Sequence, residues 1–354
     1  MEQPKRTEVG ALGEFGLIKV LTAPFKNIQE STLKGIGDDA AVIDNGNGNC
    51  TVVTTDMLME GIHFDVMYTP LKHLGYKSVV VNLSDIYAMN ATPKQITVSI
   101  AVSNRYSVEA LEEIYEGIRF ACKEYEVDLV GGDTTSSLSG LAISITAIGQ
   151  ARTSDIVYRN TAQKGDLICV SGDLGGAYLG LQLLEREKRI FLEHPEVQPD
   201  LENQQYLVGR QLKPEARKDI IALLKEANVK PTAIIDVSDG LSSDILHIAT
   251  QSNAGCLIFE DDVPIMNDVF MKALDFSLDP ITCALNGGED YELLFTVKNE
   301  DKAKIDEMHD VSIIGIITDA SEGYKLKTKQ GNFHELKAQG WDALLKVQKL
   351  KTEE

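Results

Sequence analysis

The stretch Ile234-Ile-Asp-Val-Ser-Asp-Gly-Leu-Ser-Ser-Asp-Ile245 places two carboxylates, Asp236 and Asp239, and a glycine where an apolar strand gives way to a helix. Carboxylates of the same kind follow or interrupt apolar segments in Gly37-Asp-Asp39, Thr54-Thr-Asp56, Asn82-Leu-Ser-Asp85 and Gly131-Gly-Asp133. Carboxylates are seldom packed into apolar surroundings unless they are paired or bound to metal, and few Lys or Arg residues lie near these. The pattern therefore predicts a site for a hard, oxygen-ligated cation such as Mg²⁺.

The overall composition limits the size and the partners of the protein. The chain has 354 residues, 43% of them apolar and 25% charged, which is typical of a globular protein with two domains of ordinary size. Its formal net charge is −20. Such a charge argues against nucleic acid or an anionic membrane surface as the main partner, and it suits cation binding.

The five cysteines are widely scattered and form no Cys-x-x-Cys pair, so neither a disulfide framework nor a zinc site is indicated. The first ten residues lack the apolar core of a signal peptide, and no later segment reaches the roughly 18 apolar residues of a membrane helix. We therefore expect a reduced, cytoplasmic protein without a membrane anchor.

The first half of the chain mixes the periodicities of helices and strands. We expect helices at 11–22, 71–90 and 107–125, and strands at 51–55, 95–102, 127–130 and 141–148. The helix at 71–90 is apolar on both faces, so it should be buried, and Asp85 on it must then meet a charge or a metal. These elements predict an α+β fold, with an N-terminal mixed domain at 1–150 and a C-terminal α+β domain at 151–354.

In the second half, strand 166–170 leads into the glycine-rich turn Ser-Gly-Asp-Leu-Gly-Gly-Ala, which invites a dinucleotide-binding interpretation. The spacing is not G-x-G-x-x-G and no suitably placed acid follows, so turn and packing glycines explain it better. Residues 190–213, with two prolines and much Glu and Gln, are typical of a surface insertion, and Pro214 is expected to begin a helix to Ala227.

Dispersed Asp residues suit phosphoryl transfer, which needs the charge of a polyphosphate neutralised and two reactants aligned. The sequence contains no G-x-x-x-x-G-K-[ST] loop and no H-R-D or D-F-G motif, so a third kinase design is required. A non-catalytic divalent-cation binder is the alternative. A calcium module, however, packs its ligands into one short loop such as D-x-[DN]-x-[DN]-G, and no such loop occurs here.

Six motifs together closely resemble the thiamine-monophosphate kinase family: Gly-Ile-Gly-Asp-Asp-Ala-Ala-Val, Thr-Thr-Asp-Met-Leu-Met-Glu-Gly-Ile-His-Phe, Val-Asn-Leu-Ser-Asp, Val-Gly-Gly-Asp-Thr-Thr, Asp-Val-Ser-Asp-Gly-Leu and Asn-Gly-Gly-Glu-Asp-Tyr-Glu-Leu. The resemblance runs in order from Gly13 to Trp341. Aminoimidazole ribotide and selenophosphate synthetases share some of these themes. Glu60-Gly-Ile-His-Phe64 and the Gly-Gly-Glu-Asp-Tyr-Glu-Leu motif favour the thiamine enzyme, and no reactive Cys precedes the first Gly-Asp-Asp.

This resemblance implies ATP-dependent phosphorylation of thiamine monophosphate to thiamine diphosphate by a homodimer whose N-terminal sheets pair into a barrel. It implies that residues 1–150 form the ATP/Mg-binding and dimerisation domain and that residues 151–354 complete the active site. It implies Mg²⁺ ligands at Asp39, Thr54, Thr55, Asp56, Asp85, Asp133, Asp236 and Asp239, with Asp133 and Asp239 the most important. It implies ATP contacts at Tyr115, Gly132, Asp133, Arg159 and Ser238, and substrate contacts at His63, Glu289 and Trp341.

Several of these residues have a purely structural alternative. Asp38 and Asp44 suit caps or turns as well as ligation, and His63 by itself would more often be a satisfied structural histidine. Trp341 and Tyr115 could simply pack against apolar neighbours. A binding role is favoured over a structural one for Asp85, Asp133, Asp236 and Asp239.

Overall fold

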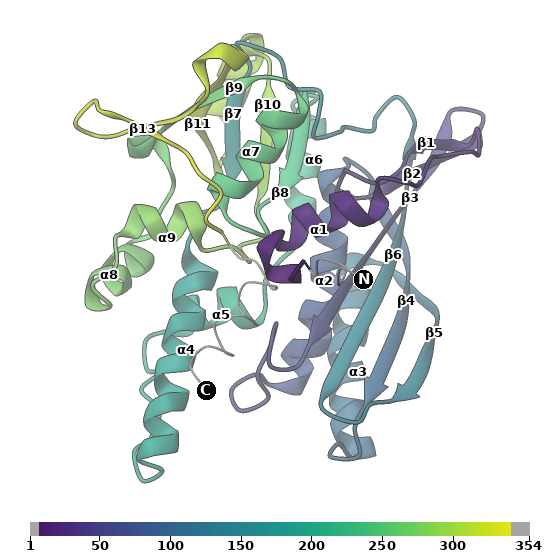
Figure 1. Cartoon of the computed structure of the whole chain (residues 1–354), viewed down its shortest axis with the longest axis vertical. Helices are drawn as coiled ribbons and strands as arrows, with labels where there is room; N and C mark the ends of the chain where they lie inside the picture. Colours follow the sequence, from purple (N-terminus) through teal and green to yellow (C-terminus); the bar gives the residue numbers. More distant parts are fainter. Residues whose placement is uncertain (1–6, 341–354) are drawn as a thin grey trace, which may run out of the picture.

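Two mixed β-sheets organise the protein in the computed structural model, which describes residues 7–340 (Figure 1). The first sheet has the strand order β1-β2-β3-β6-β4-β5, and only β4 and β5 run parallel. Its strands are β1 (Thr32–Lys34), β2 (Ala41–Gly46), β3 (Asn49–Met59), β4 (Thr92–Val102), β5 (Asp128–Ser136) and β6 (Leu141–Arg152). The β1–β3 and β6–β4–β5 portions are therefore joined by one long pairing between β3 and β6.

Two helices, α2 (Leu71–Ala88) and α3 (Val108–Tyr125), cover one face of the first sheet (Figure 1). Alternation along the strands produces this arrangement, because Val98 and Ile145 are buried under the helices. Ser99 and Met57, on the opposite face, are exposed. The expected burial of α2 is confirmed, and the predicted cap Ser107 accepts a hydrogen bond from the backbone N–H of Ala110 at 3.2 Å.

The second sheet has the order β13-β12-β9-β11-β7-β10-β8. It comprises β7 (Leu167–Ser171), β8 (Ala233–Asp236), β9 (Gly255–Phe259), β10 (Leu293–Val297), β11 (Val311–Thr318), β12 (Tyr324–Lys327) and β13 (Phe333–Glu335). The helices outside the first sheet are α1 (Gly13–Thr22), α4 (Gly176–Glu193), α5 (Gln205–Leu212), α6 (Lys218–Glu226), α7 (Leu241–Gln251), α8 (Asn267–Asp275), α9 (Pro280–Asn286) and α10 (Lys302–Asp306). Short 3₁₀ helices occur at η1 (Val9–Ala11), η2 (Glu260–Asp262), η3 (Asn299–Asp301) and η4 (Ala320–Glu322).

The strand-to-helix junction at Asp236 is confirmed. Buried Ile234 and Ile235 belong to β8, which ends at Asp236, and α7 begins at Leu241. Gly240 precedes the helix with a φ of +107°, and a Cβ there would lie 3.0 Å from the backbone of Asn286. Only glycine fits this turn without strain.

Residues 190–213 agree with the prediction of a surface insertion only in part, because residues 191–200 are exposed. Helix α4 continues to Glu193, and α5 packs against it with Leu207, Gln211 and Leu212 buried. The prediction is wrong for α5, because its apolar side chains fall on one helical stripe that the surrounding Glu and Gln obscured. The next helix begins at Lys218 and not at the predicted Pro214.

The α+β class with two mixed sheets is confirmed. The last strand of the first sheet in the sequence ends at Arg152, and the first strand of the second sheet begins at Leu167. The domain division at 150 and the pairing of sheets into a dimer barrel stay predictions. Within residues 7–340, none of the helices combines the length and apolar character that crossing a membrane requires. The five cysteines are free thiols.

Candidate active site

Three aspartates from distant parts of the sequence meet between the two sheets. Asp39 follows β1, Asp85 lies on α2, and Asp236 ends β8. One carboxylate oxygen of each lies within 4.8 Å of the others. Like charges at this separation repel strongly in a partly buried site, so the cluster requires a compensating cation or protons.

Hydroxyl groups fix the direction of two of these carboxylates. The Thr54 hydroxyl on β3 donates to Asp85 Oδ2 at 2.6 Å, and the Ser84 hydroxyl on α2 donates to Asp236 Oδ2 at 2.6 Å. Asn82 Oδ1 accepts a hydrogen bond from the backbone N–H of Asp56 at 2.9 Å, which ties β3 to α2. The Asn-Leu-Ser-Asp motif therefore supplies both a carboxylate and the groups that orient its neighbours.

Arg159 is the positive charge closest to the cluster. Its guanidinium forms an ion pair with Asp39 and lies 3.5 Å from Asp38 Oδ1, while Lys34 lies 3.0 Å from Asp38 Oδ2. Asp38 is thus held by two cations and serves the structure. Asp39 Oδ2 is buried without a hydrogen-bond partner, whereas Asp38 Oδ2, which also accepts no hydrogen bond, lies beside the Lys34 ammonium group.

The carboxyl groups of the site resist ionisation when no cation is present. Burial raises the pKa of Asp39 to about 7, although Arg159 opposes the shift. Burial also raises the pKa values of Asp56 and Asp236 to about 6, and it raises that of Asp85 well above its usual range. An oxygen-only donor set with a partnerless buried oxygen and raised pKa values fits a hard divalent cation such as Mg²⁺.

A cavity of about 430 Å³ surrounds this cluster. Thr54, Asp56, Arg159, Ser238 and Asp239, all predicted to bind metal or ATP, line it. From α1, Phe15 closes one side by stacking on His247 of α7, with ring centroids 4.4 Å apart. The cavity can hold a charged group of several phosphates next to the carboxylates.

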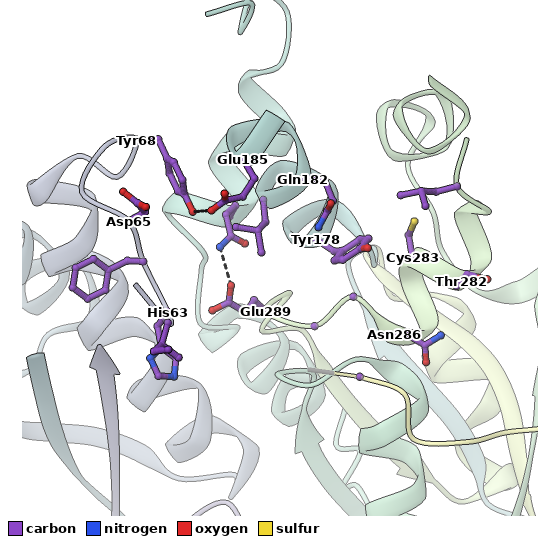
Figure 2. A pocket seen from close by; sticks show the side chains of 18 of the residues that line it. His63, Asp65, Tyr68, Tyr178, Gln182, Glu185, Thr282, Cys283, Asn286 and Glu289 are labelled. Atoms are coloured by element: carbon purple, nitrogen blue, oxygen red, sulfur yellow. Dashed lines mark hydrogen bonds between the residues drawn. The ribbon is translucent and has the colours of Figure 1, made fainter. Parts of the chain in front are cut away.

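A second cavity, of about 560 Å³, adjoins the first. His63 and Glu289 line both cavities, so they stand where the acidic cavity opens into the second one. In Figure 2 His63 lies to the left of Glu289, and Tyr178 and Gln182 lie on the other side of Glu289. The arrangement provides separate places for phosphates and for an organic group.

Residues 60–69 and helix α4 form one wall of the second cavity. The Tyr68 hydroxyl donates to Glu185 Oε1 at 2.7 Å, as Figure 2 shows, and Lys188 Nζ donates to Asp65 Oδ2 at 2.5 Å. These two bonds join residues 60–69, which follow a strand of the first sheet, to α4, which follows a strand of the second sheet. They fix the position of this wall of the cavity next to His63.

His63 has a defined orientation at this junction. Its Nδ1 accepts a hydrogen bond from the backbone N–H of Met59 at 3.0 Å. A neutral ring that accepts at Nδ1 carries its proton at Nε2. The geometry therefore leaves His63 able to donate a hydrogen bond from Nε2.

Four predicted residues do not join the cluster. Tyr115, Gly132 and Asp133 line neither cavity, and Thr55 lines the first cavity but donates its hydroxyl to the Ile145 carbonyl. Asp133 lies on β5 and is exposed. Gly132, beside it, shares a row with Asp56 across β6 and β4, which separates them by about 14 Å at an interstrand spacing of about 4.8 Å. Since neighbouring residues alternate, Asp133 points to the face opposite the acidic cluster.

Two other expectations have simple outcomes. The Asp44 side chain accepts a hydrogen bond from the backbone N–H of Gly46 at 2.9 Å, which confirms the turn interpretation. Trp341 lies outside the described residues. The nearby Gln339 and Gly340 line the second cavity, and a Cβ at Gly340 would lie 1.8 Å from the Asp239 carbonyl oxygen.

The sequence interpretation missed three residues near the site. Asp244 is buried, lines the acidic cavity and has a pKa raised well above its usual range, mainly by burial. Lys77 and Gln211 are buried beside Glu289. Lys77 could have been found by the argument used for Asp85, because it is a charge within a helix that is apolar all round.

Comparisons with known proteins agree with this fold and site. Residues 37–151 match the family model described as AIR synthase related protein, N-terminal domain, which places the fold in that class. Thiamine-monophosphate kinase of Buchnera aphidicola subsp. Schizaphis graminum is 37% identical over 90% of this chain and 95% of its own. Its Bacillus subtilis counterpart is 35% identical over 82% and 85%. The chain belongs to the thiamine-monophosphate kinase family.

A solved structure shows the same relationship in three dimensions. The protein called AaThiL, complexed with AMPPCP and TMP, superposes with a TM-score of 0.81 over 96% of this chain and 99% of its own, at 31% identity. The structural likeness therefore covers both sheets and both cavities.

Proposed function

We propose that the protein transfers the γ-phosphoryl group of ATP to thiamine monophosphate, giving thiamine diphosphate and ADP. The observation that carries this proposal is the pairing of an acidic, oxygen-lined cavity with a second cavity through His63 and Glu289. The complex of AaThiL with an ATP analogue and TMP supports it, as do the curated relatives.

The acidic residues would hold Mg²⁺ between the sheets. Asp39, Asp85 and Asp236 offer converging oxygens, and Asp56 and Asp239 line the same cavity. Bound there, Mg²⁺ would neutralise and align the phosphate oxygens of donor and acceptor. Arg159, Ser238 and the Asp39 segment would meet the phosphates of ATP from the same side.

The acceptor requires little activation from the chain. A phosphate monoester has a second pKa of about 6, so at neutral pH its oxygen can attack without a general base. In the proposed step, an acceptor oxygen bonds to the γ-phosphorus as the bond to the leaving ADP oxygen breaks. His63 donates from Nε2 to orient the acceptor, and no residue carries the phosphoryl group.

An assay of ATP consumption against a panel of thiamine and purine-pathway phosphates tests the function. We expect turnover with thiamine monophosphate and background rates with the purine intermediates. Calorimetry tests the alternative of a non-catalytic cation binder, because an enzyme should bind nucleotide when Mg²⁺ is present. Heat from Mg²⁺ alone, with none from nucleotide, would support the cation binder.

Direct transfer predicts that no phosphorylated enzyme forms. Incubation with γ-labelled ATP and Mg²⁺ but without acceptor should leave no stoichiometric label on the protein after denaturation. Label should appear in thiamine diphosphate once thiamine monophosphate is added. Covalent label at one equivalent per chain would rule out the direct route.

Replacing His63 by alanine should chiefly raise KM for thiamine monophosphate, by about tenfold to a hundredfold, because one hydrogen bond to a charged group is worth about 1.5–3 kcal/mol. Much of kcat should remain, since the proposed step has no histidine base. Steady-state kinetics at saturating ATP measure both constants. A fall in kcat of several thousandfold with KM unchanged would instead identify His63 as a catalytic residue.

We further propose a homodimer that covers the open face of the first sheet. Met57 and Met59, two residues apart on β3, are exposed on the face opposite α2 and α3. Such a face invites pairing with a second sheet. A second chain there would also bring Asp133, which points to that face, near nucleotide. The cytoplasmic location stays a prediction.

A further inference from the structure

A lysine and a glutamine lie buried against Glu289: Lys77 lines neither of the two cavities, whereas Gln211 lines the second one together with Glu289. Lys77 of α2 is 4% exposed, and its Nζ lies 3.2 Å from Glu289 Oε1. Gln211 of α5 is also 4% exposed, and its Nε2 donates to Glu289 Oε2 at 2.8 Å. Each oxygen of the Glu289 carboxylate therefore has its own donor.

The two donors are themselves joined. Lys77 Nζ donates to the backbone carbonyl of Gln211 at 2.9 Å, so α2 and α5 meet at this point. Figure 2 shows the bond to Glu289 at the edge of the second cavity. The Glu289 side chain remains 21% exposed, which leaves part of the carboxylate facing the cavity.

The backbone around Glu289 is held by other contacts. Its N–H donates to the Ser238 carbonyl at 2.7 Å, and the next carboxylate, Asp290, accepts from the N–H groups of Gly175 and Ala177. Lys77 and Gln211 therefore have no part in placing the loop itself. Their contacts determine only the direction of the Glu289 carboxylate.

Burying a lysine is costly, and an apolar side chain of similar volume often serves stability as well or better. The stem of Lys77 alone would fill its place in α2. Its ammonium group forms an ion pair with Glu289, which lines both cavities. The charge therefore has a use beyond packing.

We propose that Lys77 and Gln211 are positioning residues that fix the Glu289 carboxylate toward the second cavity, where it attracts a cationic organic ring of the acceptor. This inference rests on the proposed function, because thiamine monophosphate carries such a ring. An unheld glutamate would rotate among its rotamers and lose attraction for the bound ring. Lys77 lines neither cavity and acts through Glu289 alone.

A double-mutant cycle on substrate affinity tests the proposal. The variants are Lys77→Met, Glu289→Gln and their combination, and calorimetry measures the Kd of thiamine monophosphate in the presence of Mg²⁺ and a non-hydrolysable ATP analogue. Lys77→Met should raise this Kd by about tenfold to a hundredfold, the loss expected for a charge-assisted contact. In the Glu289→Gln background the same substitution should change Kd by less than about twofold.

Lys188→Met is the matched control. Lys188 lines the same cavity and pairs with Asp65. Its effect on Kd should be the same factor with Glu or Gln at 289. An equal effect of Lys77→Met in both backgrounds would show that Lys77 acts independently of Glu289, and would overturn the proposal.

Should Lys77→Met lack a cooperative thermal transition, Gln211→Met enters the same cycle with the same expected coupling. Wild-type protein that binds thiamine monophosphate without turnover would refute the kinase function and leave the cycle decisive for Lys77. Wild-type protein that does not bind it would refute both.

Discussion

Replacing Asp236 by asparagine should lower kcat/KM for phosphoryl transfer by about a thousandfold or more, because the amide removes a charge from the centre of the metal site. Asp236 lies within 4.8 Å of Asp39 and Asp85, and it is 3% exposed. Asparagine keeps the shape and one oxygen that can still accept from Ser84. Steady-state kinetics with Mg²⁺ titration should show a higher Mg²⁺ requirement together with the loss of rate.

The same variant should be more stable than wild type when no divalent cation is present. Burial raises the pKa of Asp236 from 3.8 to about 6, so the folded protein holds a proton that the unfolded chain releases. Wild-type stability from this group is therefore present below pH 3.8 and is lost as the pH rises through about 6. The asparagine side chain does not titrate. In EDTA, the thermal midpoint of Asp236→Asn should therefore exceed that of wild type above pH 6 and equal it near pH 4.

Asp44→Asn is the control for this experiment. Its carboxylate lies on an exposed turn, where asparagine can also accept from Gly46. Activity and stability should both stay near wild type. A clear fall in the metal-free midpoint of Asp236→Asn at neutral pH would show that Asp236 is structural.

Asp133→Asn should also abolish most activity, by about a hundredfold or more, although Asp133 is remote from the cluster within one chain. The reason is the proposed homodimer, in which the open face of one first sheet meets the other. Asp133 would then act in the site of the partner. Its exposure predicts that the thermal midpoint stays near wild type.

Mixing two inactive variants tests this arrangement directly. In the proposed dimer each site takes Asp236 from one chain and Asp133 from the other. A dimer of one Asp133→Asn chain and one Asp236→Asn chain should therefore keep one intact site. After subunit exchange at equal amounts, activity should recover to about a quarter of wild type, as random pairing in a twofold dimer gives. A matched mixture of Asp85→Asn with Asp236→Asn should stay inactive, because both residues belong to one cluster.

The outcome also decides the assembly. No recovery on mixing, together with a 38.8 kDa monomer in sedimentation at micromolar concentration, would refute both the dimer and the role of Asp133. If the protein were a monomer, each site would lie within one chain, and mixing the two inactive variants could not restore activity.

Sequence alone determined the elements that carry the chemistry. The β8–α7 junction at Asp236, the buried helix with Asp85 and the alternating strands β4 and β6 follow from local periodicity and from the turn chemistry of glycine. A carboxylate in an apolar segment also signals a cation wherever it occurs, which is why Asp39, Asp85 and Asp236 could be chosen before their distances were known.

Tertiary structure alone decided which of these carboxylates meet and which groups direct them. Asp133 has the same local pattern as Asp56, yet alternation and strand order put it on the other face, because face and order depend on pairing between distant segments. Likewise α5 looks like a polar insertion, and only its packing against α4 and α2 brings Gln211 to Glu289. Contacts between segments far apart in the sequence leave no local pattern, since they depend on how whole sheets and helices pack.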